Sequence, residues 1–87
     1  MPSAILLISC EVGQEEEVAD TLCHLQGVEY VALVYGVYDL AIRLIAGSME
    51  ELESLIIKKV RSISGVRSTI TLIISRECPT AVRSIDK

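Results

Sequence analysis

The sequence repeats one pattern of apolar residues twice. When the chain is shifted by 38 residues, Gly27-Val28 falls on Gly65-Val66. The same shift aligns four further apolar pairs, which are Leu6 with Leu44, Val18 with Ile56, Leu22 with Val60, and Leu25 with Ile63. In each copy a strand-like run precedes a helix-like stripe, and a glycine followed by valine opens the next strand-like run. The repeat therefore predicts that each half of the chain forms one β-α-β unit.

Short runs of β-branched residues and leucine predict four strands, and apolar residues at three- and four-residue spacing predict two helices. The predicted strands cover 4–10, 28–35, 38–46 and 66–75, and the predicted helices cover 14–25 and 49–64. Ser48 and Glu51 form a capping box at the second helix. Gly36-Val37 has the composition of a two-residue type II′ hairpin turn. Glu15, Glu16 and Glu17 lie in the first turn of the first helix, where the helix dipole stabilises their negative charges.

The order β-α-β-β-α-β determines the fold class. With right-handed crossovers, two β-α-β units interleave into a four-stranded antiparallel sheet that carries both helices on one face. We therefore predict an α+β, ferredoxin-like βαββαβ plait. A chain of 87 residues and 9.5 kDa provides for one domain. We assign residues 1–75 to this domain and residues 76–87 to a polar C-terminal tail.

Charge and hydropathy argue against two classes of partner. The net charge is −4, and the eight basic residues are scattered along the sequence. The counterion release that drives nucleic-acid binding needs a basic patch, so we predict no direct contact with nucleic acid. The longest apolar stretch, 30–38, is far shorter than the roughly 20 residues that cross a bilayer. We therefore predict no membrane partner.

The residues that usually carry catalysis or bind metals are few. There is a single histidine, His24, and three cysteines, Cys10, Cys23 and Cys78, with no C-x-x-C pair. This set fits neither a zinc site nor a disulfide framework, and the five glycines are too isolated to form a phosphate loop. We predict no enzyme activity, no cofactor and no metal, in a protein of the reducing cytoplasm.

The predicted strands are apolar on both sides. A plait with one solvated face should alternate apolar and polar residues, but 28–35, 4–10 and 66–75 do not alternate in this way. Two helices cover one face only. At about 25 cal/mol per Å2, leaving a patch of about 600 Å2 uncovered would forgo about 15 kcal/mol, before the costs of association are subtracted. We therefore predict a homodimer that stacks the helix-free faces.

One group of residues could form a small-molecule site. Tyr35, Gly36, Tyr38 and Asp39 lie within five residues, and Thr69 and Thr71 share one face of the last strand. Asp39 could bind an ammonium group, Gly36 would allow close approach, and the threonine hydroxyls could bind a carboxylate. The same residues also have a purely structural explanation, as a turn glycine and ordinary strand formers.

The order and spacing of these marks resemble a known family. The turn Gly36-Val37-Tyr38-Asp39, the pairs Gly27-Val28 and Gly65-Val66, and Thr69-x-Thr71 are similar to the effector-binding (RAM) domain of the Lrp/AsnC transcription regulators, from Ala4 to Ser75. The resemblance implies a plait that dimerises through its sheet, assembles further into an octamer or decamer, and binds amino acids between dimers. The implied ligand-binding residues are Tyr35, Gly36, Tyr38, Asp39, Thr69 and Thr71.

Full-length family members also carry an N-terminal helix-turn-helix DNA reader, which this sequence lacks. The sequence thus resembles the stand-alone RAM proteins. We expect an amino-acid-sensing, oligomer-forming domain that acts on transcription through a full-length Lrp/AsnC partner. Three alternatives stay open at this point: an ACT-like regulatory module, a small dimeric plait enzyme of aromatic or polyketide metabolism, and a purely structural subunit.

Overall fold

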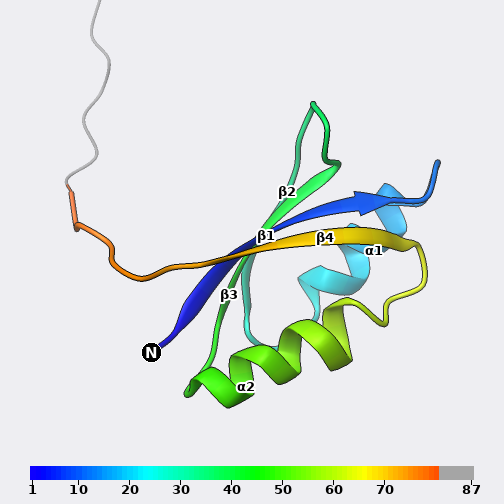
Figure 1. The fold of residues 1–87 in the computed structure, drawn as a ribbon. Helices are drawn as coiled ribbons and strands as arrows, with labels where there is room; N and C mark the ends of the chain where they lie inside the picture. Colours follow the sequence, from blue (N-terminus) through cyan, green and yellow to red (C-terminus); the bar gives the residue numbers. More distant parts are fainter. Residues whose placement is uncertain (81–87) are drawn as a thin grey trace, which may run out of the picture.

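The computed structural model describes residues 1–80, and its secondary structure follows the predicted order. The strands are β1 (Ser3–Cys10), β2 (Val28–Leu33), β3 (Leu40–Ile45) and β4 (Val66–Ile73). The helices are α1 (Glu15–Cys23), α2 (Met49–Ser54) and η1 (Leu55–Val60), a π-helix that continues α2. Figure 1 shows these elements along the chain.

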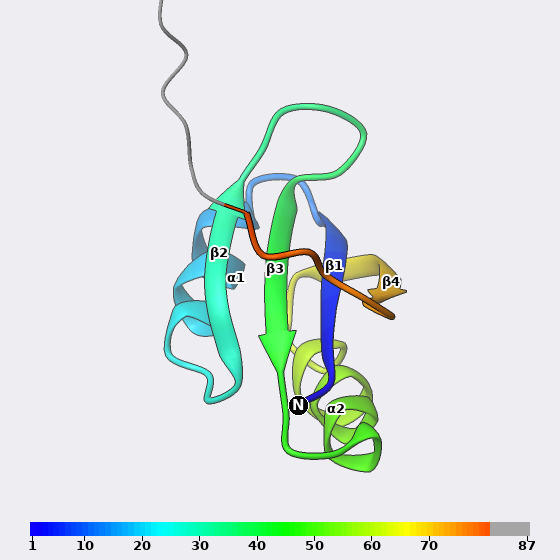
Figure 2. The same cartoon turned by 90° about the vertical axis from the view of Figure 1, so that its left-hand side faces the viewer.

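The strands form one antiparallel sheet in the order β2-β3-β1-β4. Both helices lie on the same side of it, as Figures 1 and 2 show together. Two interleaved β-α-β units produce this order, because the two central strands, β3 and β1, come from different halves of the chain. The predicted ferredoxin-like plait is confirmed.

The core lies between the helices and one face of the sheet. Alternate residues of β1 and β3 point toward the helices, as the period of two in a strand requires. The fully buried strand residues are Ala4, Leu6, Ile8, Leu40, Ile42 and Leu44. They pack with buried residues of the two helices, which are Val18, Ala19, Leu22, Leu52, Ile56 and Val60. The apolar helix residues that the 38-residue shift aligned are therefore on the helix faces that pack into this core.

The second helix differs from its prediction. It ends at Val60 rather than at 64, and its second half has π-type bonds, such as Arg61 N–H to the Ile56 carbonyl at 3.0 Å. The wider turn keeps Leu52, Ile56 and Val60 facing the core. The predicted capping box is present, because the Glu51 N–H donates to Ser48 Oγ at 3.1 Å.

The prediction of a two-residue hairpin turn is wrong. Strand β2 ends at Leu33 and β3 begins at Leu40, and one further bond joins the Val34 N–H to the Asp39 carbonyl at 2.9 Å. Residues 35–38 lie beyond this bond and form a wider loop. The pairing of β2 with β3 stops at Asp39, because this residue is held at the end of β1. The Asp39 N–H donates to the Ile8 carbonyl at 2.9 Å.

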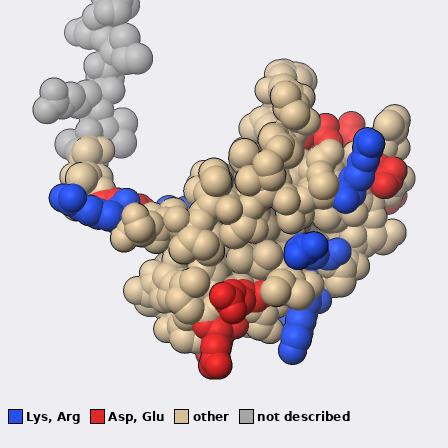
Figure 3. All heavy atoms as spheres, viewed as in Figure 1, with Lys and Arg blue, Asp and Glu red and all other residues tan. Residues whose placement is uncertain are grey.

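The sheet face away from the helices, which we call the open face, is apolar and partly exposed. Register places Ile70 and Leu72 of β4 beside Leu7 and Ile5 of β1 on this face. Tyr30, Ile70 and Leu72 are 49%, 42% and 48% exposed. In Figure 3 red and blue side chains lie over the lower and right-hand parts of the molecule and on the segment that projects at its left, and the upper part of the folded body is mostly tan. A single chain therefore leaves an apolar sheet surface in water.

Gly27, at the start of β2, has no space for a side chain. Its φ is +96°, and an added Cβ would lie 2.7 Å from Leu55 Cδ2 and 3.2 Å from the Ile45 carbonyl oxygen. We expect Gly27→Ala to lower the free energy of unfolding by about 2–4 kcal/mol, since strain at positive φ adds to overpacking.

Gly13 provides the control. Its φ is +82° and nothing lies within 4 Å of an added Cβ, so Gly13→Ala should cost only the conformational term, about 1–2 kcal/mol. Urea denaturation of both variants measures the difference. Equal losses would contradict the close packing of Gly27 on Leu55.

Candidate functional site

Asp39 is fixed at the end of the sheet by two strands. Its carboxylate Oδ2 accepts the Cys10 N–H at 2.7 Å, and its own N–H donates to the Ile8 carbonyl. Its carbonyl accepts the Val34 N–H. The half-buried carboxylate therefore has a defined position, with a second oxygen to which no protein donor is bonded among residues 1–80.

A cavity of about 430 Å3 opens beside this carboxylate. It lies between the loop that follows β2 and the first turn of α1, and its lining residues are Glu15, Glu16, Leu33, Val34, Tyr35 and Asp39. Three of these six side chains are carboxylates, and two are aliphatic. Such a cavity, which we call the acidic hollow, suits a positively charged group attached to an apolar body.

The loop residues of the predicted site lie around the acidic hollow to different extents. Tyr35 lines it and is fully exposed, and Tyr38 is half-buried. Gly36 has a φ of +144°, and no atom lies within 4 Å of an added Cβ. The bare backbone at Gly36 therefore faces open space, which leaves room for a ligand or another chain.

The two threonines lie elsewhere in the same chain. Register places Thr69 opposite Ile8 and Thr71 opposite Leu6, so the two threonines share one face of β4, as the alternation predicted, and that face is the helix side. Asp39 is bonded to Ile8 from the opposite side, so β1 separates Thr69 from Asp39. Two strand spacings put them about 10 Å apart.

Thr69 lines a hollow of its own, of about 280 Å3, together with Arg61, Val66, Arg67 and Ser68. We call it the basic hollow because it contains two arginines. A single chain therefore brings Tyr35 and Asp39 together, but it does not bring them to the threonines.

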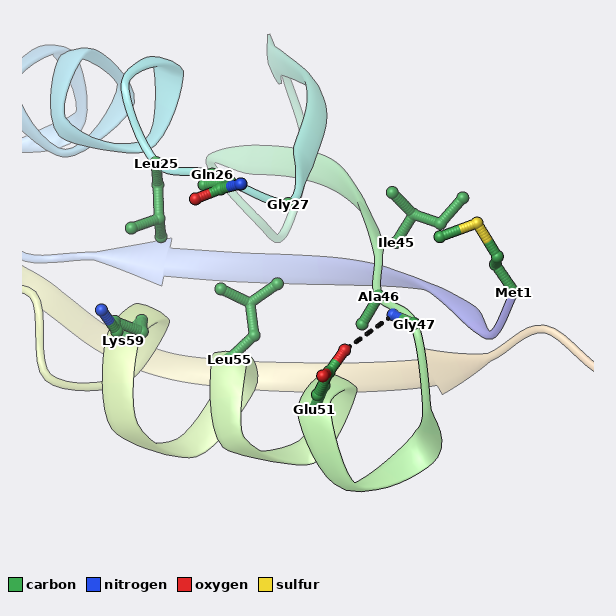
Figure 4. Close-up of a pocket in the computed structure, with 10 residues that line it drawn as sticks. All are labelled: Met1, Leu25, Gln26, Gly27, Ile45, Ala46, Gly47, Glu51, Leu55 and Lys59. Atoms are coloured by element: carbon green, nitrogen blue, oxygen red, sulfur yellow. Dashed lines mark hydrogen bonds between the residues drawn. The ribbon is translucent and has the colours of Figure 1, made fainter.

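A third cavity, of about 550 Å3, lies at the other end of the sheet. Figure 4 shows Leu25 and Leu55 pointing toward each other across it, between the start of β2 and the helix α2-η1. Its acidic side chain, Glu51, accepts the Gly47 N–H at 3.0 Å and so caps the helix. None of the six predicted site residues lines this cavity.

Cys10 lies beneath Asp39 and is buried. Burial raises the pKa of its thiol, and the negative charges of Asp39 and Glu15 raise it further. Cys23 and Cys78 are exposed.

We expect iodoacetamide at mildly alkaline pH to modify Cys23 and Cys78 within minutes and to leave Cys10 unmodified until the chain unfolds, because the thiolate is the reactive form. Mass spectrometry of peptides with and without denaturant tests this. Rapid labelling of Cys10 in the folded protein would contradict its burial.

Within residues 1–80, no group of three or more His, Cys, Asp or Glu side chains could hold a metal ion. None of the helices in that range is long and apolar enough to cross a membrane.

Sequence reasoning missed Glu15 and Glu16 as site residues. In the sequence, their position in the first turn of a helix was a sufficient explanation for two acidic residues. Only the tertiary structure shows that this turn lies next to the loop before β3. It also missed the Cys10 N–H, a backbone group that no sequence pattern reveals.

Comparison with known proteins decides the family. The family model of the Lrp/AsnC ligand-binding domain matches residues 3–81. The chain belongs to the Lrp/AsnC family. A relative named as an uncharacterized HTH-type transcriptional regulator of Pyrococcus horikoshii is 37% identical over 59 residues, which are 68% of this chain and 39% of the relative. The chain thus spans well under half of that regulator's length.

Solved structures of other proteins share the fold. A Thermus thermophilus protein is 29% identical, with a TM-score of 0.85 over 92% of this chain and 100% of that one. A Neisseria meningitidis transcriptional regulator, solved as a complex with L-Met, is 15% identical, with a TM-score of 0.81 over 91% of this chain and 53% of that one. At that identity the second likeness shows the fold alone.

Proposed function

We propose that this Lrp/AsnC domain binds an amino acid and couples its binding to self-assembly, and so modulates transcription through a partner regulator without contacting DNA itself. The observation that carries the proposal is the acidic hollow, where Asp39 is held by β1 beside two further carboxylates and an apolar wall. This arrangement suits the ammonium group and side chain of an amino acid.

The homodimer is the first part of the proposal. The open face exposes Tyr30, Ile70 and Leu72, and a second copy of the same face is self-complementary in a two-fold arrangement. Burying it removes apolar surface from water at about 25 cal/mol per Å2.

The ligand site between dimers is the second part. Within one chain the acidic and basic hollows are separate, and each suits one end of a zwitterion. The ammonium would meet Asp39 in one dimer, and the carboxylate would meet Thr69 and Thr71 in the adjoining dimer. Tyr35, Gly36 and Tyr38 lie on the exposed loop that would reach across. This geometry supports an assembly of several dimers, such as an octamer or decamer.

Its partners and setting complete the proposal. The relatives named as transcriptional regulators support a regulatory role rather than an enzymatic one, with a full-length Lrp/AsnC regulator as co-assembling partner. The net charge of −4 supports the absence of direct DNA contacts. We place this function in the cytoplasm, as the three free cysteines suggest.

Titration calorimetry with each protein amino acid in turn tests the proposal, and light scattering with and without each one follows the assembly. We expect one or a few amino acids to bind and to change the distribution of oligomers, because a ligand shifts an assembly only through different affinities for its states. Assembly with no binding by any amino acid would favour a purely structural subunit instead.

A further inference from the structure

The chain leaves the sheet after β4 and passes over the open face. The Ile74 N–H still bonds to the Ser3 carbonyl, at 3.0 Å. Residues 75–80 make no strand and are all exposed. In Figure 2 the orange-red segment passes in front of β1 and β3, and in Figure 1 it projects away from the folded body.

One ion pair holds this segment to its own sheet. Glu77 Oε2 accepts from Arg43 Nη2 at 2.8 Å, and the Ser3 hydroxyl lies 3.5 Å from the same oxygen. Arg43 lies on β3, where register pairs it with Ile5 and Tyr30 of the open face, and it also bonds to Glu29. The arginine side chain is 24% exposed and Glu77 is 50% exposed.

The segment crosses the part of the open face around Ser3 and Arg43 and leaves the part around Leu7 uncovered. Ser3 pairs with Ile45 at the last position of the β1-β3 ladder, so the Glu77 contact lies near that end. Leu7, farther along β1, pairs with Ala41 and Ile70 in the middle of the face. A second sheet therefore has room to stack on the part around Leu7 while the segment lies beside it.

We propose that residues 76–80 form an arm that packs against the second copy in the homodimer, with the Glu77–Arg43 pair as the anchor that directs it. The inference rests on the proposed homodimer through the open face. Its occupant is a second copy of this chain, because the arm starts on the face that the second copy would cover.

Two features of the arm fit this role. Stacked sheets lie about 10 Å apart, so a segment that leaves one face over its central strands comes into contact with a sheet stacked on that face. Pro79 has no N–H to satisfy and disfavours a helical conformation at Cys78, which suits an arm without strand partners of its own.

The dimer dissociation constant, measured by sedimentation velocity over a dilution series, tests the arm. The full chain is the reference, a chain that ends at Thr80 keeps the arm, and a chain that ends at Ser75 lacks it. We expect the chain ending at Ser75 to dimerise at least about tenfold more weakly than the chain ending at Thr80. Circular dichroism checks that both are folded.

Glu77→Gln in the full chain tests the anchor without removing residues. It should weaken the dimer about two- to fivefold, as expected for the loss of an exposed ion pair. Glu53→Gln on α2 changes the charge equally, away from the open face, and should leave the constant unchanged.

Equal or tighter dimerisation without the arm would overturn the inference, and tighter binding would make the arm a competitor of the second copy. A full chain that is monomeric would instead overturn the proposed homodimer itself. The two failures are therefore distinguishable.

Discussion

Leu72→Glu should convert the assembly to monomers. Leu72 lies on the open face, 48% exposed in a single chain and opposite Ile5 in the sheet register. In the proposed dimer each copy would bury a carboxylate against apolar side chains with no partner, and the two-fold arrangement doubles this cost. We expect the dimer dissociation constant to rise at least about 100-fold. Sedimentation velocity at micromolar concentration measures it.

Ile57→Glu is the matched control for this experiment. Ile57 is 57% exposed, so it is as accessible as Leu72, but it lies on η1 on the other side of the molecule. The substitution introduces the same charge in place of a similar apolar side chain and should leave the dimer intact. If both variants dimerise like the wild type, the open face is not the interface. If both variants are monomeric, the loss of the dimer cannot be attributed to the open face.

Asp39→Asn and Asp39→Ala should separate the two roles of Asp39. The asparagine variant keeps an oxygen that can accept the Cys10 N–H but loses the charge, so it should fold normally and bind the amino acid at least about tenfold more weakly. The alanine variant also leaves the Cys10 N–H without its acceptor and should lower the free energy of unfolding by a further 1–3 kcal/mol or so. Calorimetry and chemical denaturation measure the two effects.

Asp20→Asn on α1 controls for the change in net charge, because the Asp20 side chain is exposed and does not line the acidic hollow. It should bind ligand with wild-type affinity. Unchanged ligand binding by Asp39→Asn would contradict the role of the carboxylate. Unchanged stability of Asp39→Ala would contradict its role in holding the end of β1.

The fold could be predicted because the information for it is local and repeated. The stripe through Leu52, Ile56 and Val60 and its counterpart through Val18 and Leu22 are visible in the sequence, and both are buried. The glycines that close the repeats, Gly27 and Gly65, do have positive φ, +96° and +99°. Sequence also revealed the second apolar face, because strand residues on both sides of the sheet are aliphatic.

The candidate site could be predicted only in part. Its residues were chosen from the sequence and from a family resemblance, but which of them meet depends on tertiary structure. Asp39 bonds to β1 and lies beside the first turn of α1, and β1 separates it from Thr69. The loop at Gly36 is wider than its composition suggested, because bonds to Ile8, Cys10 and Val34 fix Asp39. Nothing local in the sequence encodes these contacts.

The mass of the wild-type chain in dilute solution tests the central claim most directly. Sedimentation equilibrium at low micromolar concentration should find particles of at least twice the 9.5 kDa chain mass, because the open face needs a second copy to cover it. A folded, stable species of 9.5 kDa at that concentration would contradict the account.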